Sequence, residues 1–184
     1  SLPGQEGNPL RGHCESILYS LRQSACDSEQ LPRVIGVTSC YAGEGVTTLP
    51  SQLALAAAAS GQRVLLADVN FVSTGLHKVF RTVLRPGIVE SFQGGPSLEQ
   101  TVRSLPGSTL SFATTGHVRS APQTGHIEGL RELVRFAEDG YDFAVLDLPP
   151  LNRPAETLPL CGLLDGILLL VRTDSGSRFV VIKS

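Results

Sequence analysis

The chain has 184 residues, of which 41% are hydrophobic and 17% are charged. This balance is typical of a globular protein and excludes a wholly disordered chain, a collagen and a coiled coil. The 15 basic and 17 acidic side chains leave a net charge of −2, which argues against nucleic acid as a partner. The sequence contains no run of about 18 apolar residues, so it predicts no membrane-spanning segment.

The chain is expected to form a single domain that contains a lead-in, a helix and a core. Residues 1–12 predict a flexible lead-in. Residues 13–30 predict an N-terminal helix, because apolar side chains recur there at helical spacing. These side chains are Cys14, Ile17, Leu18, Leu21 and Ala25. Residues 33–184 form the expected core, and we expect its C-terminal end to lack a closing helix, as in a truncated core.

Apolar strand-like runs alternate with helical patterns through this core. Five runs are mainly apolar, at 34–37, 64–68, 110–113, 143–147 and 167–171. Helices are predicted between them, at 47–60, 88–93, 98–102, 127–137 and 154–163. Continuously apolar strands are buried on both faces, as in a parallel sheet covered by helices. The sequence therefore predicts an α/β fold, doubly wound, with a mostly parallel sheet and helices on both faces.

Three features of the sequence meet at the carboxyl ends of these strands, where ligands bind in such sheets. The first is a glycine-rich turn at 39–48, between a buried strand and an Ala-rich helix. Its glycines let backbone N–H groups face an anion, and the helix N-terminus points to the same place. The other two are Asp68 and Asp147, which end the second and fourth predicted strands. With the hydroxyl of Thr47, these carboxylates predict a Mg²⁺–nucleotide site.

The phosphate-binding motif itself is incomplete. The P-loop pattern is G-x-x-x-x-G-K-[ST], and its lysine position is Val46 in this chain. A glycine-rich turn without that lysine is also compatible with a purely structural turn, and this alternative stays open. Its place between a strand and a helix, beside two strand-end carboxylates, favours descent from a phosphate loop.

Several segments match one family in order and spacing, which is more specific than any single motif. They are VIGVTS at 34–39, GEG at 43–45, TT at 47–48, GQRVLLAD at 61–68, GLHKVF at 75–80, RPGI at 85–88, SLE at 97–99, YDFAVLDLPP at 141–150 and VR at 171–172. From about Cys14 to Arg172 the chain thus resembles the bacterial tyrosine kinases (BY-kinases) of capsule and exopolysaccharide synthesis. That family is grouped with the partitioning and division-site ATPases of the deviant P-loop class, which implies a P-loop NTPase-like fold.

The resemblance implies a role for each residue at a matching position. The phosphate loop (Walker A) that binds nucleotide would consist of Gly43, Glu44, Gly45, Val46, Thr47 and Thr48. Thr47 would also bind Mg²⁺. Asp68 matches the first acid of Walker A′, a base or a ligand to metal-bound water, and Asp147 matches Walker B, which holds Mg²⁺ through water. Asp68 and Asp147 are thus the catalytic candidates, and Mg²⁺ with ATP or ADP is the implied cofactor of a live site.

The chain departs from the family pattern where the family carries charge. Val46 replaces the lysine that reaches the β- and γ-phosphates, and Tyr41 stands where the partitioning ATPases carry a second lysine. Asn70 replaces the second acid of Walker A′, and the basic pair that follows has become Phe-Val at 71–72. The family carries an oligomerisation motif of an acid and two arginines on its first helix. The predicted helix at 13–30 can be aligned with this motif in two registers, and neither of them retains both arginines. With three Tyr in all, the chain shows no tyrosine-rich tail.

Three functions are consistent with this pattern. The first is a degenerate BY-kinase-like domain, a pseudokinase of polysaccharide synthesis or export with weak or absent Mg²⁺–nucleotide binding. It would lie in the cytoplasm, at the inner face of the membrane when bound to a membrane-embedded protein partner. The second is an active ATP-dependent tyrosine kinase with a relocated cation. The third is a nucleotide-free structural module in which Val46 packs as an apolar plug beside Tyr41. Oligomeric state stays open, although the incomplete arginine motif argues against a family-type ring.

Overall fold

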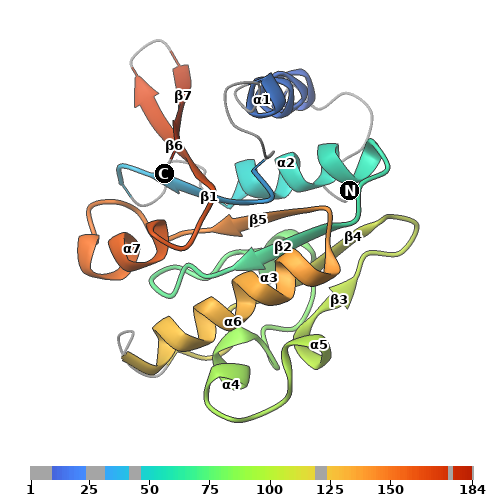
Figure 1. The fold of residues 1–184 in the computed structure, drawn as a ribbon, viewed down its shortest axis with the longest axis vertical. Helices are drawn as coiled ribbons and strands as arrows, with labels where there is room; N and C mark the ends of the chain where they lie inside the picture. The colour runs from blue at the N-terminus through green and yellow to red at the C-terminus, as the bar shows by residue number, and fades with distance from the viewer. Residues whose placement is uncertain (1–9, 24–31, 42–46, 119–123, 174–175, 184) are drawn as a thin grey trace.

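The strands form one sheet in the order β3-β4-β2-β5-β1-β6-β7 (Figure 1). The computed structural model describes residues 10–23, 32–41, 47–118, 124–173 and 176–183. Its strands are β1 (Val34–Ser39), β2 (Val64–Asp68), β3 (Arg103–Ser104), β4 (Leu110–Ala113), β5 (Phe143–Asp147), β6 (Gly166–Thr173) and β7 (Gly176–Lys183). The five inner strands pair in parallel, whereas β3 and β7 pair antiparallel at the two edges. The predicted mostly parallel sheet is therefore confirmed.

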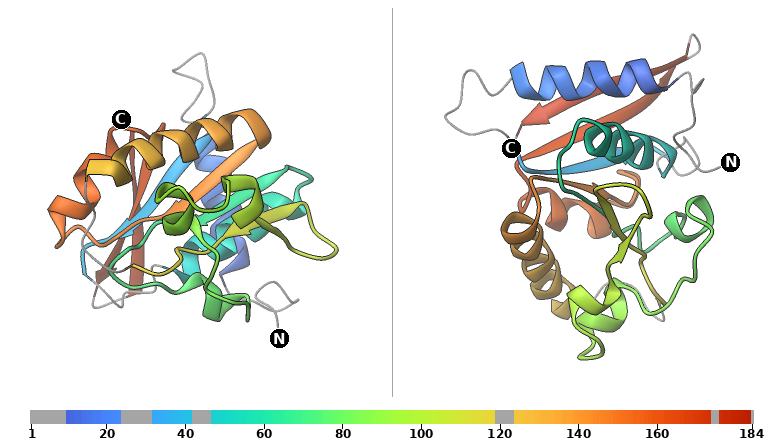
Figure 2. Two further views of the ribbon diagram at one scale, coloured as in Figure 1. Left: turned by 90° about the horizontal axis from the view of Figure 1, so that it is seen from below. Right: turned by 90° about the vertical axis from the view of Figure 1, so that its right-hand side faces the viewer.

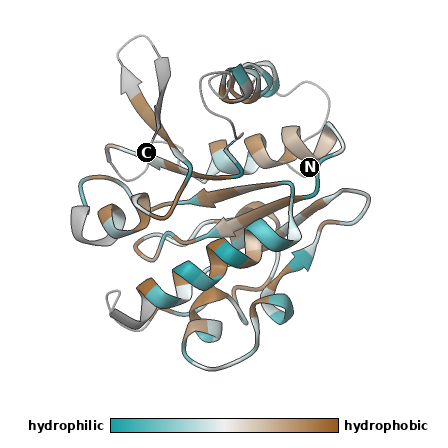
Figure 3. Ribbon diagram, in the orientation of Figure 1, coloured by the Kyte–Doolittle hydropathy of each residue, from teal (hydrophilic) through white to brown (hydrophobic). Residues whose placement is uncertain are grey.

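Helices cover both faces of this sheet. They are α1 (Arg11–Gln23), α2 (Thr48–Ala59), α3 (Leu76–Val79), α4 (Ile88–Phe92), α5 (Leu98–Thr101), α6 (Thr124–Gly140) and α7 (Pro154–Cys161). Successive side chains of a strand point to opposite faces. Ile35 and Val37 accordingly pack with α1 and α2, while Val34 packs with α4, α6 and α7. Figure 3 shows the apolar central strands between these helical layers, and the doubly wound prediction is confirmed.

The two N-terminal helices follow from simple sequence signals. The apolar stripe of α1 is buried at Cys14, Ile17, Leu18 and Leu21, and it packs on α2 (Figure 2). The composition of α2 is dominated by Leu and Ala, which are strong helix formers. Its Pro50 lies in the first turn, where the missing N–H has no intrahelical partner to lose.

Some boundaries differ from the prediction. The helix expected at 13–30 begins at Arg11 and is described to Gln23, and Ala25 lies outside the described residues. The strand expected to be the last is followed by β7, which pairs antiparallel with β6 along its whole length. The edge strand β3 was not predicted either, because two residues carry no readable alternation.

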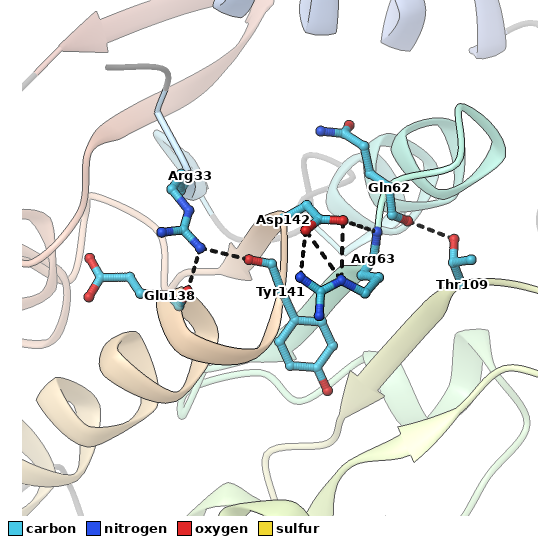
Figure 4. Close-up of polar contacts among 7 residues, drawn as sticks. All are labelled: Arg33, Gln62, Arg63, Thr109, Glu138, Tyr141 and Asp142. Atoms are coloured by element: carbon cyan, nitrogen blue, oxygen red, sulfur yellow. Dashed lines mark hydrogen bonds and ion pairs between the residues drawn. The ribbon is translucent and has the colours of Figure 1, made fainter. Parts of the chain in front are cut away.

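The amino-terminal edge of the sheet is closed by polar contacts (Figure 4). The guanidinium of Arg63 forms an ion pair with Asp142 at 2.7 Å, and the Arg63 N–H donates to the same carboxylate at 2.9 Å. Arg33 donates to the carbonyl groups of Glu138 and Tyr141 at the end of α6. The Asp142 carboxylate and the guanidinium groups of Arg33 and Arg63 thus all have hydrogen-bond partners at this edge.

Candidate functional site

Asp68 and Asp147 lie side by side at the carboxyl edge of the sheet. They end β2 and β5, which are neighbouring parallel strands, and they are register partners. Both side chains are fully buried. The Val69 N–H donates to the Asp147 carbonyl at 3.0 Å, which fixes the two strand ends to each other. The structure therefore brings together the two carboxylates predicted from the sequence.

The carboxylate of Asp68 is held by backbone N–H groups. Its Oδ1 accepts from Asn70 at 3.2 Å, and its Oδ2 accepts from Gly75 and Leu76, each at 3.1 Å. Burial raises the pKa of Asp68, and these hydrogen bonds oppose the rise because they favour the charged form. Asp68 thereby fastens the turn after β2 to the end of that strand.

The carboxylate of Asp147 has no such partners. Neither of its oxygens accepts a hydrogen bond from the described residues. Burial raises the pKa of Asp147 well above its ordinary value, and the neighbouring charge of Asp68 raises it further. The hydroxyl of Thr47 lies close enough to oppose this rise, although it does not reach hydrogen-bond geometry. A buried carboxylate without partners calls for an explanation, because most buried polar groups are paired.

Thr47 connects the start of α2 to the turn after β2. It is the N-cap residue of α2 and is half-buried. A Cβ added to Gly75 would lie 2.6 Å from the Thr47 hydroxyl oxygen, so the glycine permits this close approach. Thr47, Asp68 and Asp147 thus meet in one place, as predicted from the sequence.

The rest of the predicted phosphate loop is not described. Gly43, Glu44, Gly45 and Val46 lie outside the described residues, so their nucleotide-binding roles stay predictions, as does that of Thr48, which is exposed in the first turn of α2. The sequence from 40 to 48 contains no Lys or Arg. The ion pairs formed within the described ranges involve other acids, namely Glu15, Asp142, Glu90 and Glu128.

The positions that depart from the family pattern have structural contacts of their own. The side-chain oxygen of Asn70 accepts from the Ser73 N–H at 3.0 Å and so closes the turn. Phe71 is buried in the cluster beneath α6, whereas Val72 is exposed. Tyr41 is 64% exposed. The turn is therefore stabilised by an amide and an apolar contact where the resemblance implied an acid and two basic residues.

The three residues suit a magnesium ion. Mg²⁺ is bound by oxygen ligands, typically one or two carboxylates together with waters and substrate phosphates. Asp147 offers two buried oxygens without hydrogen bonds, and the hydroxyl of Thr47 lies beside it. A cation here would satisfy the orphaned carboxylate, so the residues fit the implied group.

Two residues of this cluster were not singled out from the sequence. Gly75 belongs to a segment that matches the family, but its role depends on the approach of Thr47, which no local pattern reveals. Thr115 follows β4 and is fully buried beside Asp68. The sequence shows it only as part of a polar loop, and a polar residue next to a buried strand end is a weak signal.

Comparison with known sequences confirms the resemblance to bacterial tyrosine kinases. The chain is 28% identical over 143 residues to the tyrosine-protein kinase YwqD of Bacillus subtilis, covering 77% of this chain and 60% of that protein. It is 29% identical over 142 residues to the putative tyrosine-protein kinase EpsB of Ralstonia solanacearum, covering 77% of this chain and 19% of that protein. It is 28% identical over 145 residues to the succinoglycan biosynthesis transport protein ExoP of Rhizobium meliloti, covering 76% of this chain and 18% of that protein. The chain thus spans less than two thirds of the length of each of these relatives, and no family model matches it.

Solved structures give the same result for the fold. The BceF tyrosine kinase domain matches with a TM-score of 0.73 and 27% identity, over 89% of this chain and 65% of that chain. The kinase domain of the Escherichia coli tyrosine kinase ETK matches with a TM-score of 0.82 and 22% identity, over 89% of this chain and 64% of that chain. The septum site-determining protein MinD of Pyrococcus horikoshii, solved with Mg-ADP, matches with a TM-score of 0.62 and 20% identity, over 74% and 56%. The P-loop NTPase-like fold is therefore confirmed. Across the described residues, no helix is both long and apolar enough to cross a membrane.

Proposed function

We propose that this chain is a degenerate kinase-like domain of a bacterial polysaccharide synthesis or export system. It binds Mg²⁺–nucleotide weakly and acts in the cytoplasm by contact with a protein partner of that system. The similarity to tyrosine kinases and to a succinoglycan transport protein supports the setting. The observation that carries the proposal is the combination of a retained metal-binding cluster with a missing lysine.

The retained part is the cluster of Thr47, Asp68 and Asp147. The orphaned oxygens of Asp147 would hold Mg²⁺ together with the Thr47 hydroxyl. An ion held there would supply positive charge to the phosphates of a bound nucleotide. Asp68, fixed by three backbone N–H groups, keeps the turn after β2 against the site.

The missing part is positive charge for the phosphates. A hydrogen bond to a charged group contributes about 1.5–3 kcal/mol, so a valine at position 46 costs roughly ten- to a hundredfold in nucleotide affinity. Phosphoryl transfer depends more strongly on such charge, since an arginine finger contributes about 10³–10⁵ in rate in related chemistry. Weak binding without appreciable transfer follows from these magnitudes.

An assay for phosphotyrosine tests this proposal. The protein and the variant Val46→Lys are incubated with Mg-ATP and a tyrosine-containing peptide, and phosphotyrosine is measured by mass spectrometry. We expect no product from the wild type. Phosphorylation at a rate of about 1 s⁻¹ or more, as kinases show, would refute the proposal and would identify an active tyrosine kinase with a relocated cation. Its Asp68→Asn variant would then be inactive.

A further inference from the structure

A second orphaned polar group flanks Asp68 on the side away from Asp147. The sheet order places β4 next to β2, opposite β5, and Thr115 follows the end of β4. Its side chain is fully buried, and its hydroxyl has no hydrogen-bond partner among the residues the structure describes. β4 pairs in parallel with β2, with Ala113 opposite Ala67, so the chain at 114–115 leaves β4 at the level of Asp68. At this place the Thr115 hydroxyl favours the charged form of the Asp68 carboxylate against the effect of burial on its pKa.

The backbone around Thr115 is held firmly in place. The N–H groups of Ile88 and Val89, at the start of α4, donate to the carbonyl oxygens of Thr114 and Thr115, each at 2.9 Å. The carboxylate of Glu90 accepts from the N–H groups of Gly87 at 2.9 Å and His117 at 3.1 Å. The hydroxyl is therefore presented to Asp68 by a fixed loop.

The Asp68 carboxylate has room for one more hydrogen bond. An ionised carboxylate offers about four lone-pair sites, and three are occupied by the N–H groups of Asn70, Gly75 and Leu76. A hydroxyl can rotate to donate to the fourth site. Thr114, the preceding residue, differs because its hydroxyl donates to the Leu84 carbonyl at 2.8 Å and accepts from Arg103 at 3.0 Å.

We propose that Thr115 is a positioning residue of the cation site. Its hydroxyl donates the fourth hydrogen bond to Asp68 and so fixes the carboxylate beside Asp147 when a divalent cation binds. This inference rests on the proposed Mg²⁺–nucleotide function. Groups that orient the ligands of a metal change its affinity by about 10–100-fold when they are removed, so the loss of this hydroxyl should weaken cation binding by about tenfold.

Binding of Mn²⁺ tests this proposal. It is measured in the presence of saturating ADP, from the electron paramagnetic resonance signal of the free ion. The variant Thr115→Val deletes the hydroxyl at nearly constant volume, Thr115→Ser retains it, and Thr115→Ala replaces the valine variant if the latter does not fold. Thr114→Val is the matched control from the same loop. ADP affinity in EDTA is measured alongside, because a merely structural role would change it too.

We expect about tenfold weaker Mn²⁺ binding for Thr115→Val, wild-type binding for Thr115→Ser and Thr114→Val, and unchanged ADP affinity in EDTA. Equal Mn²⁺ affinity of Thr115→Val and the wild type would overturn the role of Thr115 and leave the proposed function intact. An equal loss for Thr115→Ser would also overturn it, since the hydroxyl would not be responsible. A wild type that binds neither Mn²⁺ nor ADP would overturn both proposals.

Discussion

The two strand-end carboxylates are equivalent in the sequence but have different surroundings in the fold. Asp68 accepts three backbone hydrogen bonds, whereas Asp147 accepts none from the described residues. Each is buried, and their charges repel across neighbouring strands. Asp147 is therefore destabilising unless a cation or a proton neutralises it. A buried carboxylate without partners favours the proposed cation site over a plain structural turn.

The free energy of unfolding should rise when the charge of Asp147 is removed. The folded pKa of Asp147 lies above its unfolded value of about 3.9. The folded state therefore loses stability as the pH rises through that value toward the folded pKa. In EDTA at pH 7, Asp147→Asn should be about 1–3 kcal/mol more stable than the wild type, or roughly 2–12 °C in melting temperature.

Thermal melts of Asp147→Asn and the wild type across pH 3 to 8 test this prediction. The difference between their melting temperatures should vanish below about pH 3.9. Asp142→Asn is the matched control, because the Arg63 guanidinium holds the pKa of Asp142 below its usual range. Removing this charge at pH 7 should therefore lower the stability, the opposite of the effect at Asp147. A destabilised Asp147→Asn at pH 7 would show that the carboxylate has a partner in the apo protein.

At the scale of elements, one acid links the start of α4 to the loop that follows β4. Glu90, in the first turn of α4, accepts hydrogen bonds from the N–H groups of Gly87 and His117 and forms an ion pair with Arg85 at 2.7 Å. Gly116 adopts a φ of +88°, and a Cβ there would collide with the Glu90 carboxylate. This cluster carries the loop on which Thr115 lies.

Replacing this acid by its amide should loosen the loop. Burial alone would raise the pKa of Glu90, but the hydrogen bonds from Gly87, His117 and Arg85 outweigh it and lower the pKa. Its contribution is therefore present above the unfolded pKa of about 4.3 and is lost as the pH falls through the folded value. Glu90→Gln should cost about 1–3 kcal/mol at pH 7.

Urea unfolding at pH 7 and pH 3 measures this cost, with the exposed Glu132→Gln on α6 as the control. The variant should differ from the wild type clearly at pH 7 and much less at pH 3. A loss of stability that is equal at both values would mean that the side chain acts through packing and not through its charge.

Elements with a strong internal pattern could be predicted, whereas those defined by a partner could not. The five inner strands are apolar at most of their positions, and the Leu and Ala of α2 favour a helix in any context. β3 has two residues and exists through its pairing with β4. β7 is different, because its sequence contains the apolar run FVVI at 179–182, a strand signal that the prediction did not use. Only the two-residue strand β3 lacks a local signal of its own.

For the whole molecule, the sheet order decides which predicted residues form a site. The strand order β4-β2-β5 places Asp68 between Thr115 and Asp147. The sequence predicted both carboxylates because they end apolar strands. It could not single out Thr115, which resembles any polar loop residue until β4 is known to flank β2. The partner surface and the phosphate loop stay predictions.

Polarity is distributed unevenly over the two edges of the sheet. The ion pair of Arg63 with Asp142 and the hydrogen bonds from Arg33 to backbone carbonyl groups close the amino edge. The carboxyl edge holds two buried carboxylates, and the sequence from 40 to 48 contains no Lys or Arg. An edge of this kind attracts a cation more readily than a free nucleotide. We therefore infer that the scaffold is intact and that the residue at position 46 limits nucleotide affinity.

Calorimetric titration with ADP in the presence of Mg²⁺, for the wild type and Val46→Lys, tests this claim most directly. We predict that the variant binds roughly ten- to a hundredfold more tightly than the wild type, since it regains a charged hydrogen bond. Binding of the wild type at the same affinity as the variant would contradict the claim, because a cation elsewhere would then supply the charge. Absence of binding by both would contradict it as well and would establish a nucleotide-free structural module.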